Sequence, residues 1–180
     1  MSDSEQRVPF DLPKLFSLFR PTEEIPQYEV ISAEEMPQPY RELLVHEHHM
    51  TVTLEAHHGD LVEVRILERL HQGDSYARKI LLALEKSGRI VQFGIVHVDL
   101  SVCSDEVRAK IVEGKIPFGR ILIQHNVLRR IEPIAYLKIE PGQAMRDWFS
   151  LKEEKPVYGR LAYIHYNEQP AVELLEVVTL

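Results

Sequence analysis

The sequence has little of what several large classes of protein need. It has one cysteine, Cys103, which excludes an internal disulfide and favours a reducing compartment, the cytoplasm. It has no apolar run long enough to cross a bilayer, and its first residues lack the basic-then-apolar pattern of a secretion signal. It has no excess of positive charge, because the formal net charge is −7 with neutral histidines. We therefore expect a cytoplasmic protein that binds neither membranes nor nucleic acid.

The sequence also lacks the motifs of common cofactor and metal sites. It contains no glycine-rich phosphate loop and no dinucleotide fingerprint. Several histidines lie between His46 and His58, but they do not have the spacing of the His-Glu-x-x-His zinc motif. Because no cysteine pair supports a metal site, a polar helix face is the better interpretation, and we expect neither a metal nor a cofactor. Cys103 lies in no recognisable nucleophile motif.

What the sequence does contain is a succession of strands. Alternating or β-branched segments follow one another, and some are joined by turns such as the one at Gly88. They cover residues 61–70, 76–84, 90–100, 127–139, 157–166 and 171–178. Ser104 is a good N-cap for a helix that ends before Gly114, and Pro117 can open a short helix over residues 118–123. Helices segregated from a run of strands predict an α+β fold with a six-stranded antiparallel sheet.

The length of 180 residues suits one domain with a sizeable core. Residues 1–36 are rich in proline and glutamate and are interpreted as a lead-in, and residues 37–180 as the domain. Further helices are expected over residues 12–19, 40–46 and 50–58. Thr51 is the expected N-cap of the third of these and Gly59 its expected stop. Residues 140–156, which include the single tryptophan, are expected to be irregular.

The last strand carries two carboxylates, Glu173 and Glu176. They are three residues apart, so the period of two in a strand sends their side chains to opposite faces of the sheet. A carboxylate on a covered face is unfavourable unless it is paired or used, which makes one of the two a site candidate. Alternation alone does not decide which of them points inward.

Three arginines are candidates for contact with an anion. If the face of the second strand that carries Arg78 is covered, its planar fork points inward and matches a carboxylate. An arginine that reaches solvent or pairs with a glutamate is the commoner case, and spacing alone favours it. Arg120 follows a proline-glycine helix start and is expected on the surface. Arg160 follows Gly159, which indicates a bulge or a close approach of backbones, and both a structural role and a contribution to a pocket stay open.

The order and spacing of these separated segments resemble the chorismate lyase family, including its more divergent bacterial and archaeal branch. The resembling segments are residues 49–51, 54–55, 76–78, 116–120, 128–129, 158–160 and 167–170, the last leading to Glu176. The resemblance covers the chain from about residue 39 to its end. It implies a six-stranded antiparallel sheet flanked by helices, with a small buried pocket and no cofactor.

The resemblance also implies roles for five residues. An arginine at the position of Arg78 holds the carboxylate of the aromatic product, and the backbone at Phe118, with Gly119 beside it, contacts the same group. A glutamate at the position of Glu176 contacts the oxygen at the far end of the ring, and Met50 lines the pocket. Arg78 and Glu176 are thereby the expected catalytic residues. The family usually has leucine where Phe118 stands, so a narrower or differently shaped pocket is expected.

The implied activity is elimination of pyruvate from chorismate to give 4-hydroxybenzoate or a related hydroxybenzoate. Aromatisation drives this reaction, so the enzyme mainly has to orient its substrate and provide a group at the ether oxygen. Glu176 would act there as an acid, with a pKa raised by burial, or as an orienting group. The stretch before Glu176 is one residue longer than in the best-known lyases, as it is in the divergent branch. With Glu176 as the site residue, Glu173 is the solvent-facing or structural glutamate.

Two other hypotheses stay open. In the first, the same fold is a non-catalytic domain that binds a small aromatic acid, as in the effector-binding domains of certain bacterial transcription regulators. The expectation that no DNA-binding module precedes residue 37 favours the enzyme over this hypothesis. In the second, the enzyme class is the same but the substrate differs, for which Phe118 and the histidine-rich segment are the grounds. In every case the expected partner is a small molecule, and the sequence sets no oligomeric state.

Overall fold

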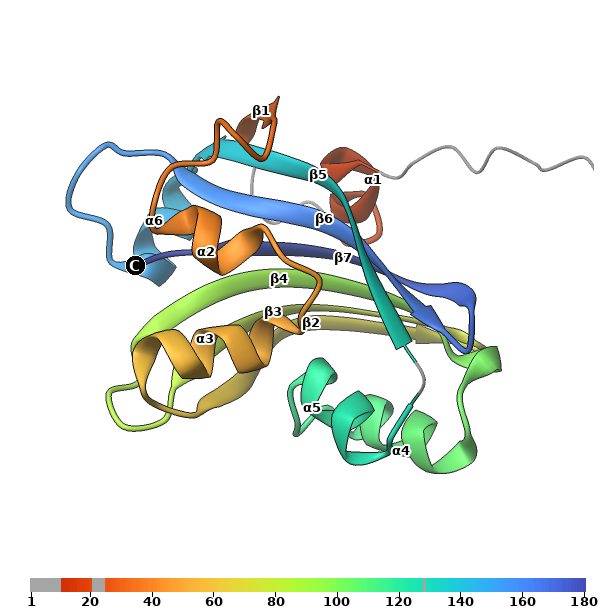
Figure 1. Cartoon of the computed structure of the whole chain (residues 1–180). Coiled ribbons are helices and arrows are strands. Elements are labelled where there is room, and N and C mark those ends of the chain that lie inside the picture. Colours follow the sequence, from red (N-terminus) through yellow and green to blue (C-terminus); the bar gives the residue numbers. More distant parts are fainter. Residues whose placement is uncertain (1–10, 21–24, 128) are drawn as a thin grey trace, which may run out of the picture.

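The structure is a computed structural model, and it describes residues 11–20, 25–127 and 129–180. It contains one sheet of seven antiparallel strands in the order β1-β5-β6-β7-β4-β3-β2 (Figure 1). The strands are β1 Gln27–Ile31, β2 Val62–Gln72, β3 Ser75–Leu84, β4 Ile90–Asp99, β5 Arg129–Glu140, β6 Val157–Tyr166 and β7 Gln169–Val178. The prediction of an α+β fold with an antiparallel sheet is confirmed, with one strand more than the six expected.

The additional strand lies in the stretch interpreted as a lead-in. β1 pairs with β5 at the edge of the sheet, where Gln27 faces Glu140 in the register. Its side chains are largely exposed, including Val30, so it lacks the apolar alternation that identifies a half-buried strand. The expected helix nearby is present but shorter, as α1 Leu12–Phe16, and it buries Leu12 and Leu15 against the sheet. The described residues before residue 37 therefore contribute a helix and a strand to the fold.

The remaining helices follow the expected capping signals at some of their ends. They are α2 Tyr40–Leu44, α3 Met50–His58, α4 Asp105–Glu113, α5 Phe118–Gln124 and α6 Gln143–Phe149, with a short 3₁₀ turn at Leu100–Val102. The Ser104 side chain accepts from the Val107 N–H at the start of α4, and α3 ends at Gly59 in the left-handed region, as predicted. The predicted N-cap of α3 is wrong: it is His49, and Thr51 is buried inside the first turn. Among the described residues, no helix combines the length and apolarity needed to cross a membrane.

The prediction that residues 140–156 are irregular is wrong, because they contain α6. Its N-cap is Gly142, which offers no side-chain hydrogen bond, so the usual start signal is missing. Packing holds the helix in place instead. Met145 and Phe149 are buried, and the ring of Trp148 stacks on that of Phe93 with centroids 5.1 Å apart. A helix of this kind is fixed by tertiary contacts that the local sequence does not announce.

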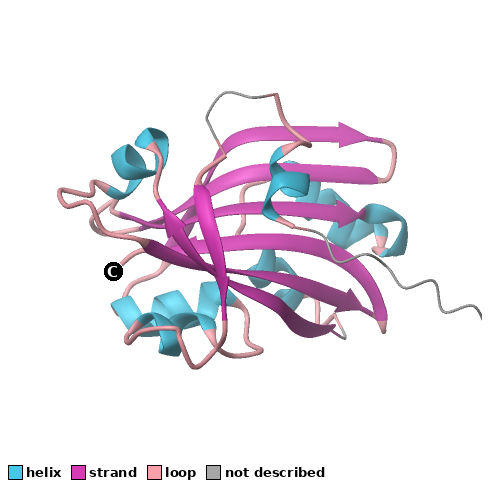
Figure 2. Cartoon of the chain, turned by 90° about the horizontal axis from the view of Figure 1, so that it is seen from above, coloured by secondary structure: helices cyan, strands magenta, loops and turns pink. Residues whose placement is uncertain are grey.

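The two faces of the sheet are covered by different helices. α1 and α6 pack on one face, over a cluster that includes Phe93, Leu161 and Leu175. The other face carries two clusters, one under α2 and α3 and one under α4 and α5. Figures 1 and 2 show the strands running as one twisted sheet through these layers. The candidate site lies on the second face, where the two clusters meet.

Candidate functional site

A cavity of about 40 Å³ lies on the sheet face beneath the starts of α3 and α5. Its floor comes from β3, β4 and β7, and most of its lining side chains are apolar. The polar side chains that line it are His49, Thr51, Arg78, Gln92 and Glu176. A small apolar cavity with a few converging polar groups is the usual form of a small-molecule site.

The structure brings together the five residues to which the resemblance assigned roles. Met50 from α3, Arg78 from β3, Phe118 and Gly119 from α5, and Glu176 from β7 all line this cavity. They are far apart in the sequence, and the sheet register and the packing of two helices place them around one space. Their roles in binding or catalysis stay predictions.

Arg78 is a buried cation without a counter-charge. Its side chain is almost fully buried, with 1% exposed, and its Nε and Nη1 atoms have no hydrogen-bond partner. Nη2 makes one long contact, donating to the carbonyl of Ile116 at 3.4 Å. Burial lowers the pKa of the guanidinium from its usual value, and the nearby Tyr76 side chain partly offsets this effect, but arginine stays charged in proteins. The expectation from spacing that Arg78 reaches solvent or pairs with an acid is wrong, because α4 and α5 cover that part of β3 and no described acid lies against it.

Arg160 is buried on the same face but is fully engaged. Its Nε donates to Glu176 Oε2 at 2.6 Å, and Nη1 donates to the carbonyl of His46 at 2.7 Å. Further bonds reach the carbonyls of Leu44 at 3.3 Å and His48 at 3.0 Å. Arg160 therefore fixes the connection between α2 and α3 onto the sheet. The close approach expected at Gly159 is present: a Cβ there would lie 2.6 Å from the Glu176 carbonyl oxygen.

The two glutamates of β7 lie on opposite faces, as alternation requires. Glu176 lines the cavity and pairs with Arg160. Glu173 lies on the face covered by α1, where it contacts His97 Nδ1 at 3.1 Å and Lys14 Nζ at 3.4 Å. The hydrogen bond with His97 is the main cause that lowers the pKa of Glu173. Glu173 thus joins α1 to the sheet, and Glu176 is the glutamate available to a molecule in the cavity.

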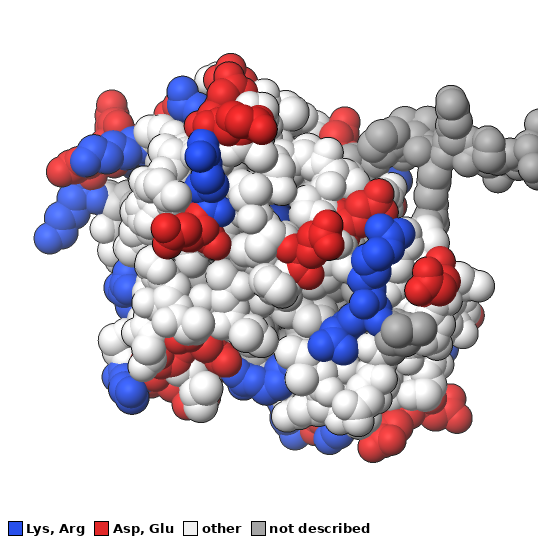
Figure 3. Space-filling view, viewed as in Figure 1, with Lys and Arg blue, Asp and Glu red and all other residues white. Residues whose placement is uncertain are grey.

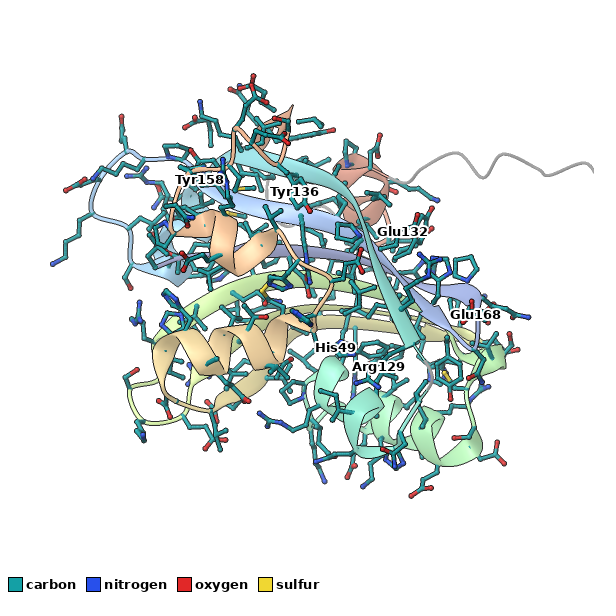
Figure 4. The ribbon with its side chains drawn as sticks, in the orientation of Figure 1. His49, Arg129, Glu132, Tyr136, Tyr158 and Glu168 are labelled. Carbon is teal, nitrogen blue, oxygen red and sulfur yellow. The ribbon has the colours of Figure 1, made fainter. Side chains whose placement is uncertain are left out.

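His49 separates the cavity from a wider, open cleft. Its ring lines both spaces, and Arg129 Nε donates to its Nε2 atom. Figure 4 labels the two side chains, which lie together near the start of α3. Gly119 packs directly against the ring, since a Cβ at that position would lie 3.1 Å from His49 atoms. His49 is therefore the side chain that the cavity and the cleft share in their linings.

Two histidines of the α2–α3 connection are held neutral. Burial, with the nearby guanidinium of Arg160, lowers the pKa of His46 to about 4. Burial and the cations Arg129 and Arg160 lower the pKa of His49 to about 4 as well. Below its usual pKa of 6.5, each of these histidines takes up a proton in the unfolded chain but not in the folded one.

Acid is therefore expected to destabilise the protein between about pH 6.5 and pH 4. The free energy of unfolding should fall by roughly 2–3 kcal/mol for His49 across this window, and by less for the half-buried His46, whose charge solvent partly screens. Urea unfolding at pH 7.5, 6, 5 and 4.5 measures the loss. His49→Gln should flatten the pH dependence by about half, and the exposed His71→Gln is the matched control that should leave it unchanged. Equal slopes for all three proteins would contradict the assignment.

Other residues considered from the sequence lie outside the cavity lining or lack reactivity. Arg120 is half-buried, not on the open surface as expected, and pairs with Glu55. Burial raises the pKa of Cys103 to about 11, far from a reactive thiolate. Within the part of the chain that the structure describes, no group of three or more histidine, cysteine or acidic side chains could hold a metal. On the face shown in Figure 3, acidic and basic side chains are mixed.

No protein-family model matches the sequence, and no curated protein matches it. The fold is similar to solved structures of transcriptional regulators. One is the ligand-binding domain of a GntR-family regulator from Bordetella bronchiseptica, with 11% identity and a TM-score of 0.48 over 66% of this chain and 85% of that chain. Another is PhnF from Mycobacterium smegmatis, with 7% identity and a TM-score of 0.48 over 72% of this chain and 63% of that chain.

A third is the C-terminal domain of a histidine utilization repressor from Pseudomonas syringae, with 8% identity and a TM-score of 0.44 over 65% of this chain and 90% of that chain. None of these three structures is described as a lyase, so a catalytic family is not confirmed. Likeness at these identities and TM-scores assigns no function to the chain.

Proposed function

We propose that this chain is a small-molecule-binding domain whose cavity takes a small carboxylic acid. The observation that carries the proposal is Arg78, a buried guanidinium in the cavity lining with two nitrogen atoms that have no partner. An unpaired buried charge is unfavourable by several kcal/mol. A carboxylate supplies both the missing charge and the two parallel acceptors that a guanidinium fork matches.

The rest of the cavity suits an apolar body behind the carboxylate. The apolar side chains that line it include those of Ile80, Val96, Ile164 and Leu174. The volume of about 40 Å³ has room for roughly three water molecules. This matches a compact acid of a few carbon atoms, or a ring acid once a side chain such as Phe118 moves. The net charge of −7 does not oppose such a ligand, because a local arginine outweighs distant negative charges that salt screens.

The proposal predicts that binding depends on the negative charge of the ligand and not only on its shape. Calorimetric titration should compare pairs of nearly equal shape, such as benzoate with benzamide and pentanoate with pentanamide. Each acid is expected to bind at least about 30-fold more tightly than its amide, because a charged hydrogen-bonded pair at a buried site is worth roughly 2–3 kcal/mol. Equal affinities for acid and amide, or no binding of any acid, would contradict the proposal.

A chorismate lyase activity is the second candidate. It is favoured by the meeting of Met50, Arg78, Phe118, Gly119 and Glu176 around one cavity. In that reaction Arg78 would hold the ring carboxylate while Glu176 contacts the ether oxygen. Because Glu176 Oε2 accepts from Arg160 at 2.6 Å, this contact favours an orienting role over that of a proton donor.

The lyase candidate is tested by following pyruvate release from chorismate and identifying the aromatic product by chromatography. If the activity exists, Glu176→Gln should lower kcat, while Glu173→Gln on the opposite face should leave it nearly unchanged. Pyruvate release at the rate without protein, in a preparation that binds carboxylic acids, would remove the lyase and leave the binding domain.

A further inference from the structure

The cavity lining holds a second buried polar atom without a partner, the side-chain oxygen of Gln92. Gln92 lies on β4, is 5% exposed and lines the same cavity as Arg78. Its Oε1 atom is buried and has no hydrogen-bond partner. Leaving a buried amide oxygen unpaired is unfavourable, and nearly all such groups in folded proteins have a partner. A ligand that donates a hydrogen bond to Oε1 would provide one.

The strand register places Gln92 and Arg78 at opposite ends of the cavity floor. Arg78 on β3 lies opposite Val96 of β4, and Gln92 lies opposite Leu82. The four-residue step from Val96 to Gln92 corresponds to about 13 Å along the strand. Alternation puts Arg78 and Gln92 on the same face, and both line the cavity of about 40 Å³.

A glycine lies between these two ends. Gly94 is on the same face as Gln92 and pairs with Ile80 on one side and Glu176 on the other. A Cβ at Gly94 would lie 3.2 Å from Gln92 Nε2 and 3.4 Å from Ile80 Cδ1. Gly94 itself therefore adds no side chain to the floor, and the Gln92 amide and the Ile80 side chain lie over it, so the amide points along the strand toward the Arg78 end.

We infer that Gln92 determines specificity by accepting a hydrogen bond from a hydroxyl or amino group at the end of the ligand opposite its carboxylate. The ligand class is thereby a small carboxylic acid that carries an O–H or N–H donor at its far end. This inference rests on the proposed function. Glu176 pairs with Gly94 between the two ends, and its Oε2 atom is already taken by Arg160, whereas Gln92 Oε1 has no partner.

The test compares acids that differ only by a hydroxyl in place of a methyl group. Suitable pairs are 4-hydroxybenzoate with 4-methylbenzoate, and 4-hydroxybutanoate with pentanoate. Calorimetry on the wild-type chain is read for the pair whose size the cavity accepts. In that pair, the hydroxy acid should bind about 10-fold more tightly than the methyl acid. In Gln92→Met, which keeps length and removes the acceptor, this preference should disappear while the affinity for the methyl acid stays the same or rises.

Three outcomes separate this inference from the proposed function. A wild-type chain that binds both members of a pair equally, or a Gln92→Met variant that keeps the preference, overturns the role of Gln92 and leaves carboxylate binding intact. Failure of all four acids to bind overturns the proposed function as well. Thermal unfolding establishes that the variant is folded, and Gln92→Leu replaces it if the methionine variant is not.

Discussion

Arg78→Met is expected to weaken carboxylate binding at least 100-fold while leaving the protein as stable as the wild type, or more stable. The binding loss follows because the guanidinium is the counter-charge and supplies both free donors, Nε and Nη1. The stability result follows because methionine is apolar, of similar length and free of the unpaired charge that the folded chain now buries. We expect the free energy of unfolding to be unchanged or to rise by about 1 kcal/mol.

Calorimetry with a bound acid and urea unfolding without it measure the two effects separately. Arg65→Met is the matched control, because Arg65 is half-exposed on β2 and pairs with Glu63 at 2.8 Å. That variant should change affinity little and stability by a few tenths of a kcal/mol. A loss of more than about 2 kcal/mol in Arg78→Met would show that Arg78 is a structural residue. Unchanged affinity would remove it from the site.

Arg160→Met is expected to have the opposite signature, a loss of about 3–5 kcal/mol in the free energy of unfolding. Arg160 is completely buried, and its removal leaves Glu176 and the carbonyls of Leu44, His46 and His48 without their donor. Urea unfolding at pH 7.5 measures the loss. Two arginines on one face of the sheet are thereby assigned different functions by what surrounds them.

The double variant Arg160→Met with Glu176→Gln provides the control for the loss in Arg160→Met. It removes the carboxylate that the single variant leaves unpaired, so part of the lost stability should return, by about 1–2 kcal/mol. A single variant that loses less than about 1 kcal/mol would contradict the structural role of Arg160. It would also show that the α2–α3 connection is held mainly by other contacts.

The central strands could be predicted from sequence because each has an apolar or β-branched pattern bounded by turn residues. β6 Val157–Tyr166 has the bounds expected from its pattern alone. β1 could not be predicted because an edge strand pairs through its backbone, and its side chains are largely exposed. α6 was missed because Trp148 and its neighbours are held by packing on Phe93, far away in the sequence.

The candidate site could be predicted only in part. The positions of Arg78 and Glu176 came from a family resemblance, and spacing alone favoured a solvent-reaching Arg78. Whether an arginine in a strand finds a hydrogen-bond partner depends on the segments packed over it. The segment packed over Arg78 offers little beyond the Ile116 carbonyl. Gln92 was not singled out. The sequence feature that could have pointed to Gln92 is a polar residue two positions before Gly94, on the same covered face of the sheet. This feature becomes informative once the strand register is known.

The NMR signals of the arginine Nε–H groups during titration with a carboxylic acid test directly whether Arg78 binds the carboxylate. The Arg78 Nε–H lacks a partner in the ligand-free chain, so its proton should move downfield when the acid binds. The Arg160 Nε–H, already bonded to Glu176 at 2.6 Å, serves as the internal reference and should change little. If a saturating acid leaves the Arg78 signal in place, Arg78 does not bind the carboxylate.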